Sequence, residues 1–250
     1  MKLSIYEDEL KLDAELCLPK DYEEGSRIPI CLIIHGFTGN KDERHLIAVS
    51  DAMNEMGIAT LRADMYGHGC SDGSFRRHTL FKWIENALTL IDHIKKDPRF
   101  GDLYLCGHSQ GGLTAALAAK MEEEKLKALI LLSPAFVIPE DARNGNLLGV
   151  RFDTKDLPAD CKAKEGWILG ENYIRVARMI HVEESIRGFE KPVLVVHGDE
   201  DRSIPIEPVK KMAEEYTDCC FATIPGESHC YDHHLDQVVV NVKSFLKSKR

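Results

Sequence analysis

The hydrophobic pattern of the chain predicts strands that alternate with helices. Continuous apolar, sheet-forming runs are typical of strands buried on both faces, and they occupy residues 28–36, 58–67, 103–109, 128–134 and 191–198. Alternation of apolar and polar residues from Leu10 to Leu18 predicts a half-buried antiparallel strand, and 219–226 reads as a final strand. Apolar spacing typical of helices covers about 41–56, 79–96, 110–121, 206–216 and 232–248.

Such alternation indicates right-handed crossovers and an α/β fold with a mostly parallel central sheet flanked by helices. Residues 137–188 break the rhythm, because they hold no buried-strand run, although they carry Trp167 and Tyr173. About fifty residues between two core strands is far longer than an ordinary crossover loop. We therefore expect a core made of 1–136 and 189–250, and an inserted cap, 137–188, folded over the carboxyl edge of the sheet.

Charge and composition narrow the class of partner. The chain has 250 residues, 44% of them hydrophobic, and a net charge of -9, which disfavours a nucleic-acid partner. The longest strongly apolar stretch, 128–139, is too short to span a bilayer, and the first residues lack the apolar core of a secretory signal. The eight cysteines are scattered along the chain, and we expect them to be reduced thiols rather than a disulfide framework. We expect a cytoplasmic protein that acts on a small-molecule substrate and does not associate with a membrane.

A nucleophilic serine is predicted at the end of one buried strand. Gly107-His108-Ser109-Gln110-Gly111 fits G-x-S-x-G between a predicted strand and a predicted helix. A sharp turn at this point strains the serine backbone, crowds out side chains at the flanking glycines, and leaves the hydroxyl exposed at a helix N-terminus. The alternative is an ordinary glycine turn with a bystander serine.

Serine needs a base to take its proton, and the base needs an acid to orient it. His229 follows the last predicted strand, so it belongs to a loop at the same sheet edge as Ser109. Asp199, Glu200 and Asp201 lie just past another strand end, and the residues alone do not choose between Asp199 and Asp201. The order serine, acid, histidine is the one expected of an α/β-hydrolase.

Two other features complete the candidate site. The backbone N–H groups of Phe37, in HGFTG, and Gln110 are the expected donors of an oxyanion hole. A metal site built from His229, Asp232, His233 and His234 is the alternative for the histidine cluster. It is disfavoured, because we place His233 and His234 just inside the following helix, where adjacent side chains point about 100° apart. We expect neither metal nor cofactor.

Taken together, these motifs make the chain resemble the α/β-hydrolase superfamily. The stretches that carry the resemblance stand in family order: HGFTG, DMYGHGCSDG, GHSQGG, VVHGDEDRSIP and PGESHCYDHH. The match of Gly198, Asp201 and Ile204-Pro205 to the family pattern implies that Asp201 is the acid, and the resemblance likewise implies His229 as the base. A closer resemblance is to the bacterial intracellular cinnamoyl (feruloyl) esterases. It is carried by the stretches LRADMYGHG, HTLFKW and CGHSQGG.

That closer resemblance implies a role for the cap. In those esterases an acidic residue and a tyrosine of the cap bind the phenolic hydroxyl of the substrate. Asp141 and Tyr173 match those two positions in this sequence. Leu148 stands about where some members carry a glutamine, and Trp167 is a candidate wall of the acyl pocket. The expected activity is hydrolysis of hydroxycinnamate esters through an acyl-enzyme.

Other functions stay open on the sequence. They are a general carboxylesterase or monoacylglycerol lipase, a serine peptidase or amidase, and a non-catalytic protein on a hydrolase scaffold. The sequence also leaves the oligomeric state open, with a homodimer through a sheet edge or the cap as one arrangement.

Overall fold

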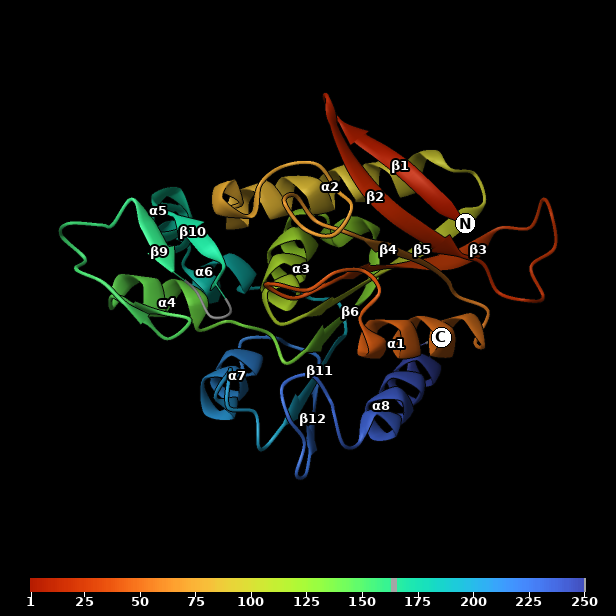
Figure 1. The fold of residues 1–250 in the computed structure, drawn as a ribbon. Coiled ribbons are helices and arrows are strands. Elements are labelled where there is room, and N and C mark those ends of the chain that lie inside the picture. Colours follow the sequence, from red (N-terminus) through yellow and green to blue (C-terminus); the bar gives the residue numbers. More distant parts are fainter. Residues whose placement is uncertain (163–165, 250) are drawn as a thin grey trace.

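An eight-stranded sheet forms the centre of the computed structural model, which describes residues 1–162 and 166–249 (Figure 1). Its order is β1-β2-β4-β3-β5-β6-β11-β12; β1 and β2 pair antiparallel, as do β2 and β4, and the remaining neighbours are parallel. The strands are β1 (Lys2–Glu7), β2 (Leu10–Cys17), β3 (Ile28–Ile34), β4 (Ala59–Ala63), β5 (Phe100–His108), β6 (Leu126–Leu132), β11 (Val193–Gly198) and β12 (Cys219–Ile224). The sheet is mostly parallel, as expected.

Helices cover both faces of this sheet (Figure 1). Alternate residues of β3 enter separate hydrophobic clusters: Ile33 packs with α1 (Arg44–Asn54) and α8 (Leu235–Ser248), and Leu32 packs on the opposite face. That second face is covered by α2 (Leu80–Lys96), α3 (Gln110–Met121) and α7 (Ile206–Ala213). Burial on both faces explains why the central strands read as continuous apolar runs.

The first strand was not predicted. In β1 only Leu3 and Ile5 share an apolar face, and of these only Ile5 is buried. The strand forms because its backbone pairs with the whole of β2, from Lys2 opposite Glu15 to Glu7 opposite Leu10. Backbone pairing with a well-patterned neighbour thus extends the sheet where the local pattern is too short to predict a strand.

A small unit, made of residues 137–162 and 166–188, lies beside the carboxyl end of the sheet (Figure 1). It contains α4 (Ile138–Arg143), α5 (Glu171–Met179), α6 (Val182–Ile186) and two short sheets, β7 (Asn146–Leu147) with β8 (Val150–Arg151) and β9 (Asp160–Lys162) with β10 (Ile168–Gly170). Tyr173, Ile174 and Ala177 of α5 are buried in the same cluster as α2 and α3. The unit therefore packs directly on the core. Two single 3-10 turns, η1 (Phe75–Arg77) and η2 (Glu123–Lys125), complete the described elements.

All eight cysteines lie in the described residues and are free thiols. Among the helices of 1–162 and 166–249, none combines the length and apolar character needed to cross a bilayer.

Candidate active site

Ser109 lies at the junction of β5 and α3 in a strained backbone conformation, with φ 54° and ψ -121°. Hydrogen bonds fix the junction: the Ser109 N–H donates to the carbonyl of Leu132 at 2.9 Å, and its own carbonyl accepts from the N–H of Ala135 at 2.9 Å. A Cβ added at Gly107 would overlap the carbonyl of Gly111. The sharp turn therefore requires the glycine that the motif supplies.

The structure brings Ser109, His229 and Asp201 into one hydrogen-bonded line. The Oγ of Ser109 lies 2.9 Å from Nε2 of His229, and Nδ1 of His229 lies 2.6 Å from Oδ2 of Asp201. Ser109 follows β5, Asp201 follows β11 and His229 follows β12. Because parallel strands end at one edge of the sheet, residues 120 positions apart meet there. In this line the Nδ1–H of His229 donates to the carboxylate, and Nε2 accepts from the serine hydroxyl.

Asp201 is held as a charged carboxylate. Its side chain is fully buried, and its Oδ1 accepts from the N–H groups of Ser203 at 2.8 Å and Ile204 at 2.9 Å. Burial alone raises the pKa of Asp201, but hydrogen bonds from His197 and His229 outweigh it and hold that pKa well below its usual range. Asp199 instead accepts from the N–H of Gly226 at 2.6 Å.

Two residues that the sequence reasoning missed hold the loop that carries His229. Glu227 is buried, and its carboxylate accepts from the backbone N–H groups of Ser228, His233 and His234. The Nε2–H of His108 donates to the carbonyl oxygen of His229 at 2.9 Å. Both groups act on the backbone, which no residue pattern reveals.

The position predicted for His233 and His234 was wrong. They lie before α8, which begins at Leu235, with His234 as its N-cap. The predicted helix began too early because the Glu227 carboxylate binds the N–H groups of both histidines, and so organises a turn in place of a helical first turn.

The two predicted oxyanion donors are available. In the part of the chain that the structure describes, the backbone N–H groups of Phe37 and Gln110 have no hydrogen-bond acceptor in the protein. Gln110 is the first residue of α3, so its N–H is one of the free donors of a helix N-terminus. Phe37 lines the same cavity as Ser109.

A cavity of about 500 Å³ opens over Ser109. Asp141 of α4 and Leu148 line it, together with Ile204 and Pro205. Burial, followed by the nearby charge of Glu140, raises the pKa of Asp141. The cavity is therefore floored by the serine and walled by both the core and residues 137–188.

The other two predicted substrate contacts lie elsewhere in this structure. Tyr173 is fully buried, and its hydroxyl donates to Oε1 of Gln110 at 2.6 Å. Trp167 is 40% exposed, with its ring 4.5 Å from the ring of Phe75. Neither residue lines the described part of the cavity over Ser109.

Comparison with known proteins places this geometry in context. The family model described as "Serine aminopeptidase, S33" matches residues 26–158. Est1E from Butyrivibrio proteoclasticus, solved with ferulic acid bound, is similar at 51% identity and a TM-score of 0.96, over 99% of this chain and 98% of that one. A second Est1E structure gives 48% identity and a TM-score of 0.92. Mouse alpha/beta hydrolase domain-containing protein 10 shares the fold at 19% identity and a TM-score of 0.78, over the full length of both chains.

Curated relatives match over part of their length. Human Protein ABHD12B is 25% identical over 189 residues, which are 74% of this chain and 49% of that protein. Lysophosphatidylserine lipase ABHD12 of Danio rerio is 28% identical over 192 residues, which are 74% of this chain and 46% of the relative. The chain thus spans about half the length of these relatives, and the structural matches confirm the α/β-hydrolase fold expected from the sequence.

Proposed function

We propose that this chain, which belongs to the S33 serine aminopeptidase family of α/β-hydrolases, is an enzyme that cleaves hydroxycinnamate esters. Such substrates are the esters of ferulic, caffeic and p-coumaric acids. At the coarser level the chain is a serine carboxylic-ester hydrolase, given its family and its 51% identity to Est1E. The observation that carries the proposal is the line from Ser109 through His229 to Asp201 beneath the cavity.

Acylation begins at Ser109. His229 takes the hydroxyl proton at Nε2 while Oγ attacks the ester carbonyl, so a tetrahedral intermediate forms. The buried carboxylate of Asp201 keeps the proton on Nδ1 and stabilises the imidazolium that results. His229 then returns the proton to the leaving alcohol, and the acyl group stays on Ser109.

Negative charge on the former carbonyl oxygen needs fixed donors. The N–H groups of Phe37 and Gln110, which have no acceptor in the described protein, supply two of them. Loss of one such donor typically raises the barrier by about 3 kcal/mol. For deacylation, a water molecule gives a proton to His229 and attacks the acyl carbonyl carbon. His229 then returns that proton to Oγ of Ser109 as the bond between Oγ and the acyl carbon breaks, which releases the carboxylic acid and the free serine.

The proposed substrate class is argued from the acid part of the ester, which becomes the acyl group on Ser109. Ferulic acid, which Est1E binds, is the acid that hydrolysis of a feruloyl ester releases. A cavity of about 500 Å³ falls within the size range of small-molecule sites. Asp141 on its wall is the proposed acceptor for the phenolic hydroxyl of the acyl group.

A panel of matched esters tests the proposal. Methyl ferulate, caffeate and p-coumarate are compared with methyl esters of aliphatic acids, and we expect kcat/KM to favour the aromatic acids by tenfold or more. Preference for aliphatic chains would instead favour a general carboxylesterase, and turnover of aminoacyl amides would favour a peptidase. Ser109→Ala should abolish hydrolysis in a folded protein, whereas turnover near that of the wild type would contradict the role of Ser109.

A further inference from the structure

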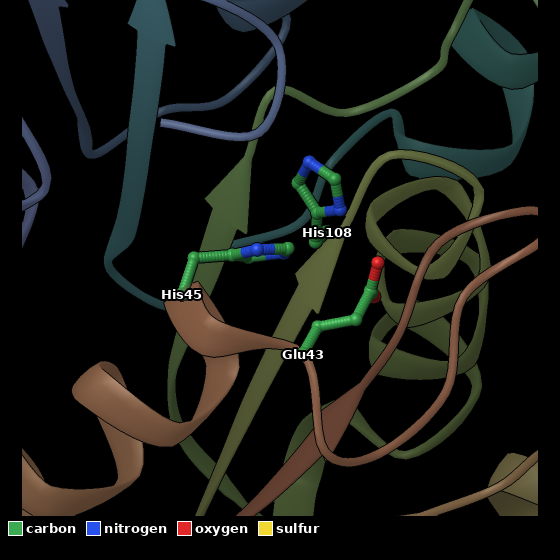
Figure 2. Close-up of side chains that lie close together, drawn as sticks. All are labelled: Glu43, His45 and His108. Atoms are coloured by element: carbon green, nitrogen blue, oxygen red, sulfur yellow. The ribbon is translucent and has the colours of Figure 1, made fainter. Parts of the chain in front are cut away.

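Three side chains behind the nucleophile bring unpartnered polar atoms together (Figure 2). Glu43 precedes α1, His45 lies in its first turn and His108 ends β5, and in Figure 2 their side chains lie close together. Their ligand atoms all lie within 4.8 Å of one another. Within 1–162 and 166–249, Oε2 of Glu43, Nε2 of His45 and Nδ1 of His108 are buried and lack a hydrogen-bond partner. Unpaired buried polar atoms are costly, so three in one place call for an explanation.

The hydrogen bond on the far side of His108 fixes which nitrogen carries its proton. A carbonyl oxygen only accepts, so Nε2 of His108 must be the protonated nitrogen that donates to His229. Nδ1 therefore carries a lone pair that faces Glu43 and His45. Histidines that bind metals almost always donate their other N–H to a carbonyl or carboxylate in this way.

Both imidazoles lie in the interior of the protein. The side chains of His45 and His108 are 3% and 2% exposed.

Glu43 brings a carboxyl group to the cluster and connects it to solvent. Glu43 and His108 both line the cavity over Ser109, so an ion can enter through it. A Cβ at Gly39 would overlap the carboxylate of Glu43, so the glycine of HGFTG leaves that carboxylate its space.

We propose that Glu43, His45 and His108 form a binding site for one divalent transition-metal ion, Zn²⁺ in particular, that regulates the enzyme. Two histidines and one glutamate are a common zinc ligand set, with the remaining position open to water. Bond lengths of 2.0–2.2 Å require ligand atoms about 3.4 Å apart, so the side chains must draw together slightly from their separations here.

Occupancy of this site has a consequence for catalysis, which rests on the proposed function. The rings of His108 and His229 are 4.8 Å apart. A divalent cation on His108 opposes the positive charge that His229 must gain as it takes the serine proton. Zn²⁺ is therefore expected to lower kcat.

Metal binding is tested directly on the full chain after treatment with a chelator. Zn²⁺ titration by calorimetry should give one site per chain in the wild type. Glu43→Gln and His45→Gln should each weaken binding by tenfold or more. The matched control is the double variant His233→Gln/His234→Gln, with Cys230→Ser as the thiol control, and both should bind as the wild type does. Wild-type affinity in Glu43→Gln and His45→Gln, or no bound Zn²⁺ in the wild type, would overturn the proposal.

A second measurement does not depend on how the variants fold. Co²⁺ bound to the wild type should show visible ligand-field bands without a thiolate charge-transfer band, and zinc-edge X-ray absorption should count two imidazoles. A thiolate band, or no imidazole, would overturn the site. Ser109→Ala should bind Zn²⁺ as the wild type does, so failure of the esterase proposal and failure of the metal site remain distinguishable.

Discussion

The hydroxyl of Tyr173 donates to Oε1 of Gln110 at 2.6 Å, and both side chains are completely buried. This bond ties α5, outside the core sheet, to the first residue of α3, directly after the nucleophile. Tyr173 therefore acts on the residue whose N–H is the proposed oxyanion donor, rather than facing the cavity in this structure.

Tyr173→Phe distinguishes this contact from the phenol-binding role that the resemblance implies. Loss of a hydrogen bond worth about 1 kcal/mol should lower kcat roughly fivefold, for methyl ferulate and methyl cinnamate alike. Steady-state kinetics on the two esters provide the measurement. A rise in KM confined to methyl ferulate would assign the hydroxyl to the substrate instead.

Asp201 and Asp199 make a matched pair. Asp201→Asn keeps the shape of the side chain but removes the charge that stabilises the imidazolium, so kcat should fall by about 10³- to 10⁴-fold. Asp199→Asn alters a carboxylate that contacts Gly226, and it should keep most of the activity. Equal losses in the two variants would mean that the contact between His229 and Asp201 is not what supports catalysis.

Gly111 allows the sharp turn between β5 and α3 to approach the sheet. A Cβ there would overlap the main-chain carbonyl of His35, which cannot move aside cheaply. Gly111→Ala should therefore lower the free energy of unfolding by about 3 kcal/mol. Gly101→Ala is the control, because its nearest new contact is an ordinary 3.5 Å, and it should change stability by no more than about 1 kcal/mol. Urea denaturation measures both, and similar values would refute the steric account.

Three buried histidines with neighbouring rings, His35, His68 and His78, make stability depend on pH. Burial is the main cause that lowers the pKa of His35 and of His78 to about 3 and that of His68 to about 4, from 6.5. Below pH 6.5 these histidines bind protons in the unfolded chain but not in the folded chain. Their contribution to the free energy of unfolding is therefore fully present above pH 6.5 and decreases as the pH falls toward 4. At pH 5 each histidine accounts for up to about 2 kcal/mol.

Denaturant unfolding at pH 7, 6 and 5 should show this loss. His78→Gln removes one of the groups and should flatten the curve. His93→Gln, on the exposed face of α2, should leave the slope as it is in the wild type. A wild-type free energy of unfolding that stays constant over this range would contradict the prediction.

Much of the fold was predictable because hydrophobic burial sets it. Strands covered on both faces, such as β3 and β11, must be continuously apolar, and helices such as α2 must show one apolar stripe. Elements held by backbone pairing rather than by burial escaped prediction. These include β1 and the two- and three-residue strands β7 to β10, which are too short to show a period.

The site divides in the same way. Strand ends mark Ser109, His229 and the acidic group after β11, and the structure places Ser109, His229 and Asp201 in contact. The residues alone left Asp199 and Asp201 open, because two positions of loop decide which carboxylate turns inward. Glu227 and the cluster around Glu43 depend on where backbone N–H groups and lone pairs point in three dimensions, and no linear spacing encodes that.

The order of the strands also bears on how the protein is made. Strand β6 is complete at Leu132, yet its partner β11 begins only at Val193. Because β6 also pairs with β5, one of its edges is satisfied, but the edge that faces β11 stays open during synthesis until residues 137–188 have followed. Another nascent chain can attach to that apolar edge. Faster translation of that stretch, or a chaperone that shields β6, should raise the yield of active enzyme in a cell.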